Sequence, residues 1–134
     1  MSPLYLLDTN IVSDLVRRPG GPVVQRIAEV GADCIAISII VACEIRFGLA
    51  KSGSQRLIQN MERVLEQIEV LPMEAPVEAH YADIRTALEH AGTPIGPNDL
   101  LIAAHARALG LTLVTHNESE FARVPGLKVE NWLR

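Results

Sequence analysis

Short apolar runs that alternate with helix-like segments constrain the fold of this chain most strongly. LYLL (4–7) and LTLVT (111–115) have the length and composition of strands buried on both faces. CIAIS (34–38) and IEVLP (68–72) are further strand candidates, and LKVENW (127–132) fits a last strand at an edge. Because strands that alternate with helices pair in parallel through right-handed crossovers, we expect an α/β fold. Its form is a three-layer α/β/α sandwich with a central parallel sheet of about five strands.

Helix start and stop signals fill the segments between these runs. Ser38 fits the N-cap of a helix that should stop near Gly53, and a second helix is expected from 54 to about 67. Residues 75–92 begin with a proline near the first turn and end in glycine, as helices commonly do. Residues 98–110 form another helix pattern that ends in glycine.

The composition is that of an ordinary globular protein. With 134 residues, 49% of them hydrophobic and 21% charged, the chain has the size of one domain, and no linker or repeat divides it. We therefore expect a single domain over residues 1–134. No apolar run approaches the roughly 20 residues of a membrane span, and the start does not resemble a signal peptide. A cytoplasmic protein without a membrane partner is expected.

The charge balance argues against a broad cationic surface. There are 16 acidic and 12 basic residues, a net charge of −4, so a nucleic acid would have to be bound by a local patch. The candidate RNA-binding residues are Arg17, Arg18, Arg46 and Arg123, each of which also fits an ordinary solvated charge. Aromatic residues are few and most fit core positions, so base stacking is not expected to carry recognition.

Three carboxylates lie where stability alone would not place them. Asp8 follows the first strand directly, either at the ligand-binding edge of the sheet or as the N-cap of the next helix. Glu44 has apolar neighbours three and four positions away, so it needs a metal ion or a charged partner such as Arg46. Asp99 opens the apolar stretch LLIAAHA, where a helix cap, by Asn98 or by Asp99 itself, is the alternative to a ligand role.

The order of the expected elements brings these acids together. Asp8 ends the first strand, Glu44 lies in the helix after the second, and Asp99 begins the helix that leads into LTLVT. The segment around the end of that strand adds Thr115, Asn117 and Glu120. If these ends share one edge of the sheet, mutual repulsion would raise the pKa values of the acids or demand a cation. Oxygen ligands without cysteine or paired histidines favour Mg²⁺ or Mn²⁺.

Four stretches resemble one protein family in their residues and in their order. LLDTNIVSDL, EIRFG, GPNDLLIAAHARALGLTLVTHNESEF and VPGLKVENW are similar to PIN domains, in particular to the VapC type of toxin ribonuclease of bacterial toxin–antitoxin pairs. The resemblance spans essentially the whole chain. It implies that Asp8, Glu44 and Asp99 are the catalytic, metal-binding acids. Where many PIN domains have a fourth aspartate, this chain reads THNESE, which assigns that position to Asn117 with Glu120 as a substitute or outer ligand.

The resemblance also implies an activity and partners. The activity is that of a Mg²⁺- or Mn²⁺-dependent endoribonuclease, the toxin of the pair, which hydrolyses phosphodiester bonds in structured RNA such as tRNA or rRNA and so inhibits translation. The partners are a cognate VapB-like antitoxin and a second copy of the chain in a homodimer. Thr9, Asn10 and Thr115 are candidates to orient ligands or phosphate, although turn or cap roles are the stronger interpretation for each. Arg46 likewise fits a surface ion pair.

Two other functions stay open at this point. A PIN-like module that binds RNA or protein with little turnover is supported only by Asn117 at the fourth position. An aspartate-based phosphatase would also place Asp8 after a buried strand. It needs a second aspartate two residues later, where this chain has Asn10, and a lysine at a later strand end, which the sequence does not offer convincingly.

Overall fold

The computed structural model describes residues 2–133 and confirms the expected three-layer α/β sandwich. Its five strands are all parallel and lie in the order β3-β2-β1-β4-β5. They are β1 (Tyr5–Leu7), β2 (Ile35–Ser38), β3 (Glu69–Leu71), β4 (Thr112–Val114) and β5 (Val129–Glu130). The central strand β1 places Tyr5 opposite Ile35 of β2 and Thr112 of β4. The carboxyl ends of the strands therefore share one edge of the sheet.

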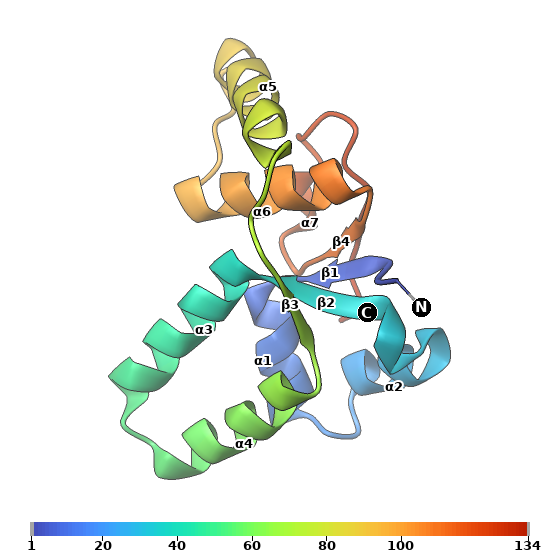
Figure 1. Ribbon diagram of the computed structural model, residues 1–134, viewed down its shortest axis with the longest axis vertical. Coiled ribbons are helices and arrows are strands. Elements are labelled where there is room, and N and C mark those ends of the chain that lie inside the picture. Colours follow the sequence, from blue (N-terminus) through green and yellow to red (C-terminus); the bar gives the residue numbers. More distant parts are fainter. Residues whose placement is uncertain (1, 134) are drawn as a thin grey trace.

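Helices cover both faces of this sheet. They are α1 (Thr9–Arg17), α2 (Pro22–Val30), α3 (Ile39–Ser52), α4 (Gln55–Glu66), α5 (Val77–His90), α6 (Pro97–Leu109) and α7 (Glu118–Phe121), with a 3₁₀ turn at Ala32–Cys34. Figure 1 shows α5 and α6 on one side of the sheet and α1, α2 and α4 on the other. α3 leaves the end of β2 and forms, with α4, a hairpin that extends away from the sheet (Figure 1). The short α7 and the 3₁₀ turn are the elements that the sequence patterns did not predict.

The core is built around the central strands and α6. Leu6, Leu7 and Leu113 have no exposed surface, as expected for strands that are covered on both faces. In α6 the small side chains of Ala103 and Ala104 are also completely buried, so this helix can lie close against its neighbours. Among residues 2–133, no helix is both long enough and apolar enough to cross a membrane.

The predicted boundaries of α3 are confirmed by its caps. Ser38 precedes the helix, and its Oγ accepts a hydrogen bond from the backbone N–H of Ile40 (3.1 Å). Gly53 follows the helix with φ of 66°, a left-handed conformation that glycine adopts without a steric penalty. The first and last turns of α3 are therefore fixed by local sequence, which sets where Glu44 projects from the helix.

One face of α3 lies in solvent, which corrects an expectation from composition. Val41, Ile45 and Leu49, each four residues from the next, are the buried side chains of this helix. Phe47 is 69% exposed, and the Nζ atom of Lys51 lies 5.8 Å from its ring centroid. Because the α3–α4 hairpin extends away from the sheet, no layer covers this ring. Phe47 is thus an exposed aromatic side chain on which a base could stack, contrary to the expectation that aromatic residues lie in the core.

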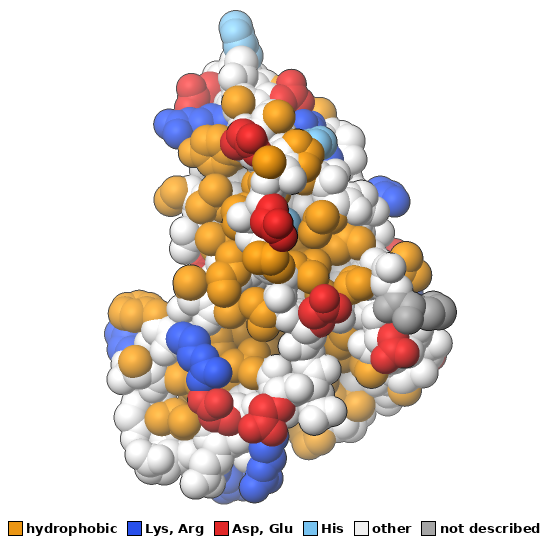
Figure 2. Space-filling view, viewed as in Figure 1, with side chains coloured by type: hydrophobic (Ala, Val, Ile, Leu, Met, Phe, Trp, Pro, Cys, Tyr) orange, Lys and Arg blue, Asp and Glu red, His pale blue; other side chains and the backbone are white. Residues whose placement is uncertain are grey.

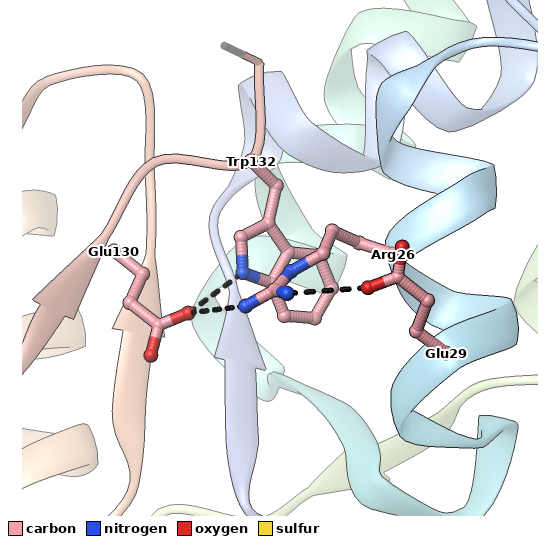
Figure 3. Close-up of polar contacts among 4 residues, drawn as sticks. All are labelled: Arg26, Glu29, Glu130 and Trp132. Atoms are coloured by element: carbon pink, nitrogen blue, oxygen red, sulfur yellow. Dashed lines mark hydrogen bonds and ion pairs between the residues drawn. The ribbon is translucent and has the colours of Figure 1, made fainter.

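A buried tryptophan fixes the C-terminal segment. Trp132 is 2% exposed, and its ring meets that of Tyr5 edge-on with centroids 5.0 Å apart. Figure 3 shows the guanidinium of Arg26, from α2, over the indole ring at 5.5 Å from the centroid and between Glu29 and Glu130. Trp132 Nε1 donates to Glu130 Oε1 over 2.9 Å. This Trp132 cluster, made of these five residues, joins α2 and the end of the chain to β1.

Candidate active site

Asp8 both caps a helix and contributes to the edge of the sheet. Its backbone N–H donates to the carbonyl of Val114 (2.9 Å), which holds it beside β4. Its Oδ1 accepts from the backbone N–H of Thr9 (2.8 Å), so Asp8 is the N-cap of α1. Its Oδ2 accepts from the hydroxyl of Thr115 (2.8 Å), the residue that follows β4. Asp8 is therefore the N-cap of α1 through Oδ1, and through Oδ2 it also belongs to the carboxyl edge of the sheet. The two interpretations from the sequence are compatible.

The environment of Asp8 opposes its charge. Burial raises the pKa of the Asp8 carboxyl above its ordinary value, although the hydrogen bonds from Thr115 and Thr9 act in the opposite direction. The carboxylate of Glu44 raises this pKa further. Burial outweighs the hydrogen bonds, so the surrounding protein leaves the negative charge of Asp8 undercompensated.

Glu44 projects from α3 toward the N-termini of two other helices. Its Oε1 accepts from the hydroxyl of Thr9 at the start of α1 (2.6 Å), and its Oε2 accepts from Nδ2 of Asn98 at the start of α6 (3.4 Å). Arg46 forms its ion pair with Glu62 of α4 instead. The alternative in which Arg46 neutralises Glu44 is therefore wrong, and the surface ion pair expected for Arg46 is confirmed.

Asp99 lies against Glu120 in the first turn of α6. It is the third residue of the helix, so the N-cap position belongs to Gly96 rather than to Asp99. Burial raises the pKa of Asp99 to about 7, and a hydrogen bond with Glu120 together with the negative charges of Glu120, Asp8 and Glu44 contributes to this rise. Glu120 Oε1 also accepts from the backbone N–H of Gly96 (3.4 Å). The four acids thus act on one another electrostatically, as the order of the elements predicts.

Two threonines donate their hydroxyls to the acids. Thr9 donates to Glu44, so its preferred interpretation as a turn or cap residue is wrong. Thr115 donates to Asp8 and also accepts from the backbone N–H of Asn117 (3.1 Å), so its turn role is confirmed beside its contact with the acid. Asn10 lies within α1 and has no local turn role: its Oδ1 accepts from the backbone N–H of His116 (3.0 Å), which holds the loop after β4, and its side chain also forms a hydrogen bond with Asp8. Two of the four acids therefore have their orientation set by a neighbouring hydroxyl.

The donor set fits a hard divalent cation. It consists of carboxylate oxygens at a partly buried edge, where negative charges repel one another and raise pKa values, and a cation would relieve that repulsion. As these side chains stand, no three histidine, cysteine, aspartate or glutamate residues within 2–133 form a group that could hold a metal ion. The carboxylates of Glu44 and Asp99 instead bind Asn98 and Glu120. Occupation of the site would require these acids to exchange such partners for the ion.

The two candidates for the fourth position, Asn117 and Glu120, differ in their contacts. Asn117 is exposed, and its backbone N–H donates to Thr115 Oγ1 (3.1 Å). Glu120 is the residue that contacts Asp99, and α7, which carries it, had no predicted counterpart. The role of Asn117 as a ligand remains a prediction. Asn98 is a site residue that sequence reasoning considered only as a cap, and its position directly before Asp99 was the available signal.

The four candidate arginines differ in their surroundings. Arg17 lines a cavity of about 280 Å³ between α1, α3 and α4, whose walls include Thr9 and Glu44. Arg18 is ion-paired with Asp14, and Arg46 with Glu62 as described above. Arg123 is exposed. Arg17 therefore shares a cavity with Glu44 of the acidic edge.

The charge repulsion at this edge makes a testable prediction for the metal-free protein. In the folded state the pKa of Asp99 is about 7, above the ordinary value of about 4 for an unfolded chain, so the folded state binds the extra proton. Stability in chelator should therefore fall as pH rises between these two values. Asp99→Asn should remove much of this pH dependence and should melt at a higher temperature than wild type at pH ~8.

Thermal melts in EDTA across this pH range measure the effect. Asp33→Asn, a change of the same kind at an exposed residue outside the acidic edge, serves as the matched control. A markedly lower melting temperature of Asp99→Asn at high pH would mean that Asp99 is a member of a stabilising ion pair, and the assignment would be wrong.

The chain matches a known protein family over most of its length. A family model described as the PIN domain matches residues 5–127, a range that includes Asp8, Glu44, Asp99 and Glu120. The parallel sheet with acids at its carboxyl edge is therefore that of a PIN domain.

Individual relatives show which type of PIN domain this chain is. The chain is 38% identical over 131 residues to "Ribonuclease VapC2" of Rickettsia felis, covering 96% of this chain and 98% of the relative. It is 36% identical over 129 residues to "tRNA(fMet)-specific endonuclease VapC" of Shigella flexneri, covering 96% and 97%. The solved structure of DNA-bound VapBC from Salmonella typhimurium superposes with a TM-score of 0.90 at 33% identity, covering 98% of this chain and 99% of that one. The chain belongs to the VapC ribonucleases of the PIN domain family.

Proposed function

We propose that this protein is a Mg²⁺- or Mn²⁺-dependent endoribonuclease that acts as the toxin of a toxin–antitoxin pair. It hydrolyses phosphodiester bonds in structured RNA, such as tRNA or rRNA, and so inhibits translation. The observation that carries the proposal is the gathering of Asp8, Glu44, Asp99 and Glu120 at one partly buried edge, where burial, together with the hydrogen bond to Glu120 and the charges of the other three acids, raises the pKa of Asp99 to about 7. The names of the relatives, which include a ribonuclease and a tRNA-specific endonuclease, support RNA hydrolysis as the reaction and structured RNA as the substrate class.

The residues at the edge divide into two roles. Asp8, Glu44 and Asp99 would hold the divalent ion, with Asn117 or Glu120 at the fourth position. When bound, the ion supplies an activated water and neutralises charge that develops on the phosphate. Thr9 and Thr115 orient the acids through hydrogen bonds of 2.6 and 2.8 Å. The exposed side chains of Arg17 and Arg123 are available to bind neighbouring phosphates.

The alternative functions have less support. An aspartate-based phosphatase needs a second aspartate two positions after Asp8, whereas this chain has Asn10, whose side chain holds the loop after β4. A PIN-like binding module without turnover would rest on Asn117 alone, and Glu120 supplies a carboxylate close to that position. Each alternative predicts that purified protein leaves RNA intact.

Cleavage of total cellular RNA by the purified protein tests the proposal. We expect cuts at few positions with Mg²⁺ or Mn²⁺ and none with EDTA, and a cleavage rate that falls as salt rises because phosphate contacts carry much of the affinity. Unfolding the RNA beforehand should remove this selectivity. Sequencing the new RNA ends gives the measurement. Cuts that persist in EDTA, or that occur throughout single-stranded RNA regardless of salt, would contradict the proposal.

The proposed partner proteins are a VapB-like antitoxin and a second copy of the chain. Two of the structures similar to this chain, from Rickettsia felis and Salmonella typhimurium, are named as VapBC complexes bound to DNA. An arginine in the tail of an antitoxin would fit the carboxylates of the acidic edge and compete with the ion. Figure 2 shows hydrophobic side chains gathered across the middle of the face that carries β3, and Ile39 and Val70 are among the exposed large hydrophobics. Such a surface suits a homodimer contact.

Light scattering and co-purification test these partners. We expect a particle of twice the mass of the chain, and RNA cleavage that stops when the product of the neighbouring antitoxin gene is added. A stable monomer whose activity this product does not change would contradict both partner assignments.

A further inference from the structure

A buried hydrogen bond joins the two helices that carry Glu44 and Asp99. Ser38, at the start of α3, and His105, in the middle of α6, are 0% and 1% exposed. The distance between Ser38 Oγ and His105 Nδ1 is 2.8 Å. Ser38 Oγ also accepts from the backbone N–H of Ile40, so the same oxygen caps α3 and binds α6.

Burial of His105 at this place costs free energy, because its polar ring is removed from water. Its neighbours Ala104 and Ala106 are completely buried, and burial lowers the pKa of the imidazole, so the ring is neutral. The backbone of Pro72 opposes that shift only in part. Nε2 has no partner with full hydrogen-bond geometry, and the backbone of Pro72 is the group that acts on the ring besides Ser38, so the second ring nitrogen is at most weakly satisfied. An apolar side chain of similar size would fill this place at lower cost, which argues for a role beyond packing.

Each residue of the Ser38–His105 pair lies at the same spacing, measured along its own helix, from the acid of that helix. Ser38 is six residues before Glu44 and His105 is six residues after Asp99, which corresponds to about 9 Å along a helix in each case. Nearer the surface, α3 and α6 are joined by the longer Asn98–Glu44 bond (3.4 Å), in which Asn98 is exposed. The short, buried bond is therefore the firmer of the two connections, and it constrains how the two helices are placed relative to each other.

We propose that Ser38 and His105 are positioning residues that set the separation of Glu44 and Asp99 and thereby the affinity of the site for its divalent ion. This inference rests on the proposed function. Neither residue touches the ion or the RNA. Their hydrogen bond limits how far the helices that carry the two acids can move apart, and the loss of groups that orient metal ligands typically reduces metal affinity about 10- to 100-fold.

The test measures ion binding directly. Ser38→Ala and His105→Phe should each weaken Mn²⁺ binding about tenfold in titration calorimetry of the full chain. The Mg²⁺ concentration for half-maximal RNA cleavage should rise by a similar factor, whereas the rate at saturating Mg²⁺ should stay close to wild type. The double variant should bind Mn²⁺ no more weakly than the single variants, because either change breaks the same bond.

Two controls separate positioning from stability. Ser54→Ala removes the N-cap of α4, whose Oγ accepts from the Leu57 N–H (3.2 Å), without touching α6. His80→Phe removes the acceptor of a 2.9 Å bond from Arg107 Nε, which joins α5 and α6. Both should lower the melting temperature and leave Mn²⁺ affinity unchanged. They thus match the two test variants in the kind of bond lost.

Two results would overturn the inference. Wild-type Mn²⁺ affinity in folded Ser38→Ala and His105→Phe proteins would show that the pair only stabilises the fold, and the proposed function would remain. If His105→Phe does not fold, Ser38→Ala, which removes a single oxygen atom, decides alone. A wild-type protein that binds no Mn²⁺ and cuts no RNA would overturn the proposed function and this inference together.

Discussion

Replacement of Asp8 by asparagine is expected to lower RNA cleavage more than about 100-fold while the protein stays folded. Loss of a group that merely supports a metal ligand costs about 10- to 100-fold, and Asp8 is assigned as a ligand itself. Asparagine has nearly the same shape and can still cap α1 through its amide oxygen, so the contact with Thr9 should persist. The change therefore removes a charge from the acidic edge and replaces the oxygen that accepts from the Thr115 hydroxyl by an amide N–H group.

Cleavage rates at saturating Mg²⁺ and melts in EDTA provide the measurement. Asp33→Asn, at an exposed position, is the control and should cleave RNA at the wild-type rate. A folded Asp8→Asn protein that retains most of its activity would exclude Asp8 as a ligand. A protein that unfolds on this change would instead mark Asp8 as mainly a structural cap.

Replacement of Trp132 by alanine is expected to lower the free energy of unfolding by about 3–5 kcal/mol. The indole ring is almost fully buried, so its removal leaves a cavity beside Tyr5. The change also removes the surface on which Arg26 lies and the hydrogen bond to Glu130 (Figure 3). The loss should be large because packing and polar contacts of the Trp132 cluster disappear together.

Urea denaturation followed by circular dichroism measures this loss. Trp132→Phe keeps an aromatic ring but lacks the indole N–H, so it should cost clearly less than alanine. Equal losses for the two variants would place the energy in the bond to Glu130 rather than in packing. A loss below about 1 kcal/mol for Trp132→Ala would show that the end of the chain contributes little to stability.

Most of the fold could be predicted because its signals are local. The runs LYLL and LTLVT became central strands, and the caps Ser38 and Gly53 delimit α3 as expected. The short α7 could not be predicted, since a helix of four residues has no periodic pattern to detect. The exposure of Phe47 could not be predicted either, because it depends on how far the α3–α4 hairpin extends from the sheet rather than on the sequence of α3.

Asp8 and Asp99 could be predicted from their places at the end of a strand and at the start of a helix, and Glu44 from its apolar neighbours within α3. The contact of Asp8 with Thr115 follows from the pairing of β1 with β4. The contacts between side chains of different helices could not be predicted from the sequence. The bonds of Glu44 to Thr9 and Asn98, and that of Ser38 to His105, depend on the angles at which helices cross, which residue spacing does not encode.

The α3–α4 hairpin has a consequence for how the site responds to local unfolding. Asp8 adjoins the central strand β1, in which Leu6 and Leu7 have no exposed surface, whereas Glu44 belongs to an arm in which α4 contributes one buried side chain, Met61. Regions with few buried contacts open more often than the core does. Glu44 is therefore held by a less stable cooperative unit than Asp8, and opening of this arm would separate one acid from the others without melting the sheet. The acidic edge would thus be assembled and disassembled by fluctuations much smaller than global unfolding.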